Sequence, residues 1–117
     1  MIKVLPESQG NLLVVRAEGK LTGEDYRDVI VPRLRALIRD HGQVRYLLDD
    51  FDGWQVAALW EDARFAMAHR SDFEKIGLVG GPAWVVWALK LIALLMRGEI
   101  KTYSRGAWDE ALRWIES

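Results

Sequence analysis

The 117-residue sequence contains no cysteine. A chain without cysteine forms no disulfide bond, has no thiolate nucleophile and holds no metal ion through thiolate sulfur. The absence of cysteine fits a reducing compartment, and we therefore expect a cytoplasmic protein.

An excess of charge of one sign is also lacking, because 16 Lys and Arg residues face 17 Asp and Glu residues. Domains that bind nucleic acid carry a basic face or stripe. Here Arg33, Arg35 and Arg39 share their segment with several acidic residues. We therefore expect no nucleic-acid partner.

The sequence has no apolar run of membrane-spanning length. A helix needs about 20 apolar residues to cross the hydrocarbon core of a bilayer. The longest run, from Trp84 to Met96, is shorter and contains Lys90. The opening residues "MIKVLPESQG" lack the apolar centre of a signal peptide. We expect neither a membrane span nor export.

Residues with catalytic potential are few. His41 and His69 are the two histidines, and neither has a second histidine at a metal-ligand spacing. Asp49, Asp50 and Asp52 could gather a cation, but neighbouring strand residues such as Asp49 and Asp50 point to opposite faces of a sheet. The sequence predicts a protein that is not an enzyme, with no catalytic residue, no metal site and no cofactor.

Short β-rich segments alternate with longer helical patterns, which is typical of an α/β fold. The order is ββαβαβαβα in a single domain, residues 1–117, with a small mixed sheet flanked by four helices. The first two strands are expected to form an antiparallel hairpin. The predicted strands are 2–6, 11–19, 43–51, 73–81 and 99–104, and the predicted helical segments are 21–42, 53–70, 82–96 and 107–117.

The first helical segment carries clear signals at both ends. Thr22 is a good N-cap with Asp25 three residues later, and Gly42 stands where a left-handed C-terminal cap belongs. Pro32 lies inside the segment and removes one helical hydrogen bond, so we expect a kink or break near Ile30 and Val31.

Periodicity also predicts which residues of two other helices face the core. Residues at three- and four-residue steps share one side of a helix. The expected inward residues are Val56, Trp60, Ala63 and Met67 in one helix, and Trp108, Ala111, Leu112 and Ile115 in the other.

The sequence resembles the SpoIIAA-like family within the STAS fold over nearly its whole length. The most specific matching positions are Thr22 with Asp25 and Tyr26, Pro32, the loop 49–54, Trp60 with Asp62, Trp84, and Glu110 and Ala111 with Trp114. The resemblance implies a small mixed sheet with flanking helices, in a bacterial family whose biochemical role is largely unassigned.

STAS anti-sigma factor antagonists carry a phosphorylatable serine in the turn after the third strand. The matching turn here is "DDFDGW", which has no hydroxyl side chain. Asp52 resembles a permanently charged version of that position, and the alternative is that Asp50 or Asp52 simply caps the following helix. The phosphate-dependent switch is not expected.

The segment 82–96 is apolar on almost its full circumference, whereas a helix lying on a sheet buries only a stripe. Leaving several such side chains in water would forgo about 1.5 to 3 kcal/mol each. We expect this helix to form an interface, unless the opening hairpin and the C-terminal helix cover it. The candidate binding residues are Trp54, Trp84, Trp87, Leu91 and Leu94.

Two function classes follow from this helix. The first is a non-enzymatic STAS-like interaction module that pairs through the apolar helical face with a second copy or another protein. The second is a carrier or sensor of a small apolar or lipid-like ligand, held between the helices at 53–70 and 82–96.

The turn "DDFDGW" yields the first testable prediction. Incubation with an anti-sigma-type kinase and ATP should leave residues 49–56 without phosphate, because this stretch has no serine, threonine or tyrosine. Tandem mass spectrometry of the digested protein provides the measurement. Phosphate located within residues 49–56 would contradict the prediction.

Overall fold

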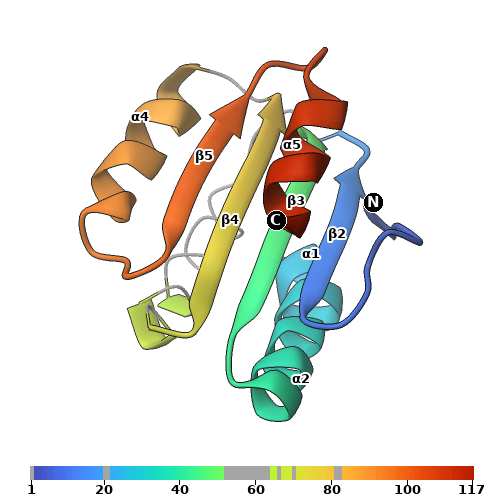
Figure 1. Ribbon diagram of the computed structural model, residues 1–117, viewed down its shortest axis with the longest axis vertical. Coiled ribbons are helices and arrows are strands. Elements are labelled where there is room, and N and C mark those ends of the chain that lie inside the picture. Colours follow the sequence, from blue (N-terminus) through green and yellow to red (C-terminus); the bar gives the residue numbers. More distant parts are fainter. Residues whose placement is uncertain (1, 20–21, 52–63, 66, 70, 81–82) are drawn as a thin grey trace.

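The structure, a computed structural model, describes residues 2–19, 22–51, 64–65, 67–69, 71–80 and 83–117. Its centre is a five-stranded mixed sheet with the strands in sequence order (Figure 1). β1 pairs antiparallel with β2, and all the other neighbours are parallel. The strands are β1 Ile2–Val4, β2 Leu12–Ala17, β3 Val44–Phe51, β4 Phe73–Gly80 and β5 Glu99–Tyr103. The predicted hairpin and mixed sheet are confirmed.

The helices lie on both sides of this sheet. The helices between β2 and β3 are behind the sheet in Figure 1, α5 crosses its front, and α4 lies beside β5. Residues 64–65 and 67–68 have helical backbone, while the earlier part of the predicted helix 53–70 lies outside the described residues. The helices are α1 Gly23–Asp25, the π-helix η1 Tyr26–Ile30, α2 Val31–His41, α4 Ala83–Ala93 and α5 Trp108–Glu116.

The inner strands are buried on both faces, as their continuous apolar sequences indicate. Alternate side chains of β2 point to opposite faces of the sheet. Leu13 and Val15 belong to the core under α2, and Leu12 and Val14 belong to the core under α5. Val14 and Val15 are both fully buried. The sheet is therefore stabilised by two separate apolar layers.

The first helical segment begins and ends as its sequence predicts. Thr22 Oγ1 accepts a hydrogen bond from the Asp25 N–H at 3.1 Å, and the Asp25 carboxylate accepts one from the Thr22 N–H at 3.0 Å. Gly42 ends α2 with φ 83°, a left-handed conformation that glycine adopts without steric cost. The capping box and the glycine cap are confirmed.

The interruption expected at Pro32 takes a different form. The segment stays helical, but η1 makes one π-helical turn and ends at Ile30, immediately before α2. The Val31 N–H donates to the Tyr26 carbonyl, five residues earlier, and Pro32 falls in the first turn of α2, where a missing N–H costs little. A widened turn thus accommodates the proline that we expected to break the helix.

The inward face expected for the helix 53–70 is wrong at Met67, whose side chain is 44% exposed. Phe65 faces the core instead and packs edge to face on Phe73, with ring centroids 5.9 Å apart. Residues two apart on a helix point in nearly opposite directions, so only one of this pair can face the sheet. Val56, Trp60 and Ala63 lie outside the described residues.

The inward face of α5 is confirmed. Ala111 and Ile115 are fully buried, and Trp108 and Leu112 pack partly buried against the same core. Trp114 also packs against this core.

Gly98 lies where the chain enters β5 and comes very close to β4. A Cβ added at Gly98 would meet the carbonyl oxygen of Phe73 and would lie 2.8 Å from that of Glu74. A side chain is excluded here because backbone atoms cannot move aside as a flexible side chain can. This close contact holds the segment between α4 and β5 against the start of β4.

Gly98→Ala should therefore destabilise the protein by about 2 kcal/mol or more, through forced separation of β4 and β5. Gly106→Ala is the matched control: an added Cβ there meets no atom within 4 Å, so its effect should stay within about 0.5 kcal/mol. Urea denaturation of both variants gives the two free energies. Equal effects would contradict the close approach at Gly98.

Candidate functional site: the exposed face of α4

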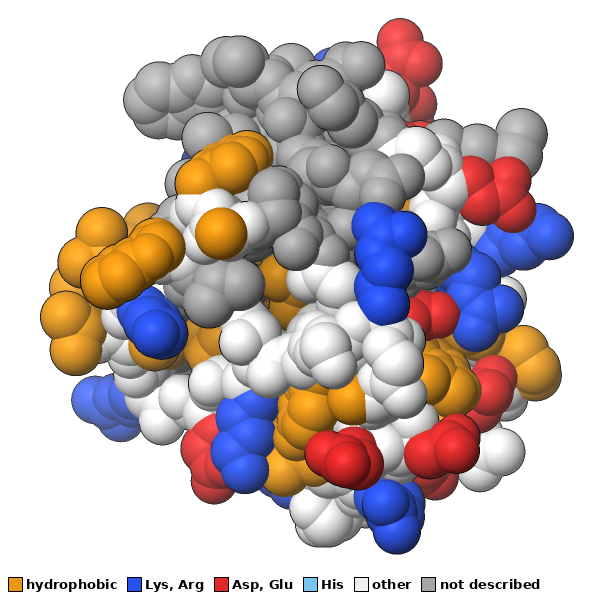
Figure 2. Space-filling view, turned by 90° about the horizontal axis from the view of Figure 1, so that it is seen from above, with side chains coloured by type: hydrophobic (Ala, Val, Ile, Leu, Met, Phe, Trp, Pro, Cys, Tyr) orange, Lys and Arg blue, Asp and Glu red, His pale blue; other side chains and the backbone are white. Residues whose placement is uncertain are grey.

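Five large apolar side chains gather on one side of α4 and the turn after it. They follow helical spacing, so they form a continuous stripe that we call the α4 face. Figure 2 shows apolar side chains at the edge of the molecule that carries α4. The α4 face consists of Trp84, Trp87, Leu91, Leu94 and Leu95, with exposed fractions of 50%, 68%, 67%, 82% and 53%.

The topology explains this exposure. β5 is the last strand of the sheet, and α4 packs beside it. α5 packs on β3 and β4 from the opposite face, while the hairpin β1–β2 lies at the other edge of the sheet (Figure 1). The alternative that the hairpin and the C-terminal helix cover this helix is therefore wrong.

Lys90 is the one charged residue of α4. Its ammonium nitrogen lies 5.1 Å from the centre of the Trp87 ring, a cation–π distance. Lys90 is exposed, as expected for a cation at the rim of an apolar surface. The charge thus sits beside the tryptophan without interrupting the apolar stripe.

The other candidate region follows β3, where the turn "DDFDGW" begins. Asp49 is 7% exposed and accepts a hydrogen bond at 2.8 Å from Nε of Arg16. The Arg16 guanidinium also lies 5.6 Å from the centre of the Trp108 ring. Asp50 is in β3, and Asp52 and Trp54 lie outside the described residues. Asp49 is therefore a buried, charge-compensated carboxylate that anchors the end of β3.

The sequence candidates are thus divided between the two regions. Trp84, Trp87, Leu91 and Leu94 come together on the α4 face, and Leu95 joins them although it was not among the predicted residues. The pairing of Arg16 with Asp49 was missed as well. These two residues are direct neighbours in the register of the parallel strands β2 and β3.

Groups suited to acid–base or metal chemistry are sparse in the described part of the chain. No three His, Asp or Glu side chains there are arranged to hold a metal ion. The pKa of Tyr103 is raised above its usual value, mainly by burial and to a smaller extent by the nearby carboxylate of Glu110. The phenol therefore keeps its proton at neutral pH and is a poor general base.

None of the helices in the described ranges combines the length and apolar character needed to cross a bilayer.

Comparison with protein families gives a match to SpoIIAA-like over residues 12–116. The chain belongs to the SpoIIAA-like family. A crystal structure of an uncharacterised DUF3478-family protein with a SpoIIAA-like fold, from Shewanella loihica PV-4, is similar, with a TM-score of 0.72 and 25% sequence identity. The similarity covers 98% of this chain and 92% of that chain. Comparison with curated proteins gives no match.

These comparisons confirm the resemblance found in the sequence and support an α/β domain with a SpoIIAA-like fold. They assign no specific role, since the similar structure is itself described as uncharacterised. Any function therefore has to be argued from the surface of this chain.

The ion pair between Arg16 and Asp49 generates a stability prediction. Asp49→Asn keeps the side-chain shape but removes the charge that compensates Arg16, and should cost about 1 to 3 kcal/mol because the carboxylate is buried. Asp40→Asn is the matched control, since Asp40 pairs with Arg39 in solvent and such pairs contribute about 0 to 1 kcal/mol. Urea denaturation measures both. A control that lost as much stability as Asp49→Asn would show that burial of the Asp49 carboxylate is unimportant.

Proposed function

We propose that this SpoIIAA-like domain is a non-enzymatic interaction module that pairs with a second copy of itself through the α4 face. The observation that carries the proposal is the exposure of two tryptophans and three leucines in one helical stripe. Soluble monomers rarely expose apolar patches larger than about 300 to 600 Å².

The size of the α4 face supports a protein partner. A tryptophan buries roughly 150 to 250 Å² when it is covered. At the observed exposures, the five side chains offer several hundred Å², on the order of the ~800 Å² per partner in a stable protein interface.

The shape and charge of the face support a second copy as that partner. A helix presents a convex surface that packs well against another helix, whereas a small ligand needs a concave site. In a two-fold interface each residue meets the same surface on its partner, so Lys90 of each copy could approach Trp87 of the other. The ammonium group of Lys90 would then lie in the dimer interface against an aromatic ring and would need no acidic partner.

The carrier function remains a prediction of the sequence. It requires a ligand between the segment 53–70 and α4, and residues 53–63 of that segment lie outside the described residues. Native mass spectrometry distinguishes the two functions, because a carrier is a monomer with a copurifying apolar molecule.

The main test is the substitution Trp87→Glu. It places a charge in the centre of the α4 face and should raise the Kd of the dimer by about 30-fold or more, the effect of losing an interface hot spot. The variant should stay folded, since Trp87 is 68% exposed and contributes little to the core. Sedimentation velocity over a dilution series gives the Kd, and thermal unfolding checks the fold.

Arg113→Glu is the matched control. It adds a negative charge at an exposed position of α5, on the opposite face of the sheet, and should leave the dimer unchanged. A wild-type protein that stays monomeric at high concentration, or a Trp87→Glu variant that dimerises like wild type, would refute the proposal.

A further inference from the structure

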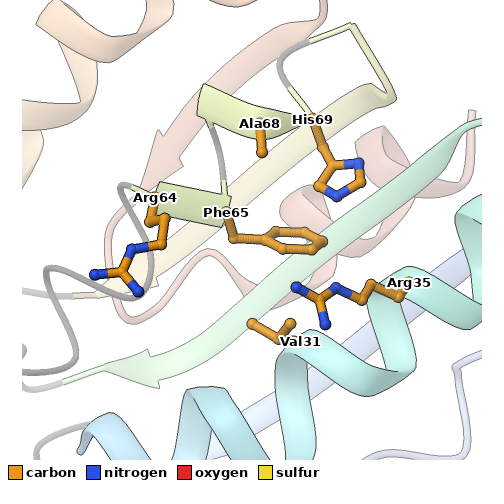
Figure 3. Close-up of a pocket in the computed structure, with 6 residues that line it drawn as sticks. All are labelled: Val31, Arg35, Arg64, Phe65, Ala68 and His69. Atoms are coloured by element: carbon orange, nitrogen blue, oxygen red, sulfur yellow. The ribbon is translucent and has the colours of Figure 1, made fainter.

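A second feature, separate from the α4 face, is a cavity of about 200 Å³ between α2 and the described residues 64–65 and 67–69. Val31 and Arg35 reach it from α2, and Arg64, Phe65, Ala68 and His69 reach it from the other side (Figure 3). At about 30 Å³ per molecule, this volume holds roughly seven waters. A ligand of similar size is therefore a small molecule.

Among the described residues that line the cavity, two are arginines, Arg35 and Arg64. Arg35 and Arg64 form no ion pair with any residue that the structure describes, and none of the described residues that line the cavity carries a carboxylate. The planar guanidinium group matches a carboxylate in shape and can donate two hydrogen bonds to it at once. Both arginines are exposed, and no described carboxylate competes with an incoming anion for their N–H groups.

His69 contributes a further polar group. Its Nδ1 lies 2.9 Å from the Asp72 carboxylate. This contact orients the imidazole ring and pairs the Asp72 carboxylate with His69. The other ring nitrogen, Nε2, has no hydrogen-bond partner among the described residues. It can therefore bond to a ligand in the cavity.

The remainder of the cavity wall is apolar and well fixed. Val31 and Phe65 are each 7% exposed. The Phe65 ring makes a T-shaped contact with Phe73 and lies tilted against His69 at a centroid distance of 4.4 Å. The Arg35 guanidinium is 5.9 Å from its centre. A flat aromatic or compact aliphatic body would pack on these side chains.

We propose that this cavity binds a small organic carboxylate with an aromatic or compact apolar body. The carboxylate binds the Arg35 guanidinium, and the apolar body contacts Val31 and Phe65. Arg64, whose side chain points away from Arg35 in Figure 3, adds positive charge at the other end of the cavity. This site is independent of the α4 face, so either assignment can fail without the other.

Sodium benzoate is the probe, because its size and chemistry match the cavity. Titration of the ¹⁵N-labelled full chain at constant ionic strength and pH should give saturable amide shifts at Arg35, Phe65 and His69. Benzamide, which has the same shape without the charge, should bind about tenfold or more weakly.

Arg35→Gln should weaken benzoate binding at least about fivefold, and Arg64→Gln should weaken it by a smaller factor because Arg64 acts through its charge. Arg39→Gln is the matched control, because Arg39 lies on the same helix but does not line the cavity. Thermal unfolding verifies that each variant is folded. If a variant is unfolded, the comparison of benzoate with benzamide on the wild-type chain tests the proposal instead.

Equal binding of benzoate and benzamide would overturn the assignment. So would shifts confined to other residues, or an Arg39→Gln variant that loses as much affinity as Arg35→Gln.

Discussion

The position of β5 at the edge of the sheet is the constraint on which the surface of this molecule depends. A helix between two inner strands is covered by the sheet and by helices on either side of it. α4 precedes the last strand, packs beside it and keeps an open side. Because its sequence is apolar on almost the full circumference, the open side exposes tryptophan and leucine. An edge location and an unbroken apolar sequence together create the α4 face.

The rest of the fold is stabilised without the α4 face. One core layer lies between the sheet and the helices η1 and α2, and the other lies under α5. The half-buried pair of Arg16 and Asp49 holds the ends of β2 and β3 together. In this chain the end of β3 is secured by a structural ion pair, while the apolar surface available for association lies at the far edge. That separation is consistent with the proposed pairing through the α4 face.

The sequence predicted the features that depend on local signals. Thr22 with Asp25 marked a helix start, Gly42 marked a helix end, and runs of β-branched and aliphatic residues marked the strands, because each depends on residues close in the chain. The exposure of Trp87 and Leu94 followed from a simple count of apolar residues around one helix.

Features that depend on tertiary contacts were missed or misjudged. Phe65 rather than Met67 faces the core because Phe73 of β4 is there to receive it, and a helical pattern alone does not contain that information. Arg16 meets Asp49 only through the register of two parallel strands 33 residues apart in sequence. The cavity at Arg35 likewise arises from two segments that the chain brings together after folding.

The most direct test of the account is an isotope-filtered nuclear Overhauser experiment on an equimolar mixture of ¹³C-labelled and unlabelled chains. It detects only contacts between copies. The account predicts intermolecular signals from the methyl groups of Leu91 and Leu94 to the ring of Trp87. Intermolecular signals that arise only from other surfaces, or none at a concentration where the α4 face should be paired, would contradict it.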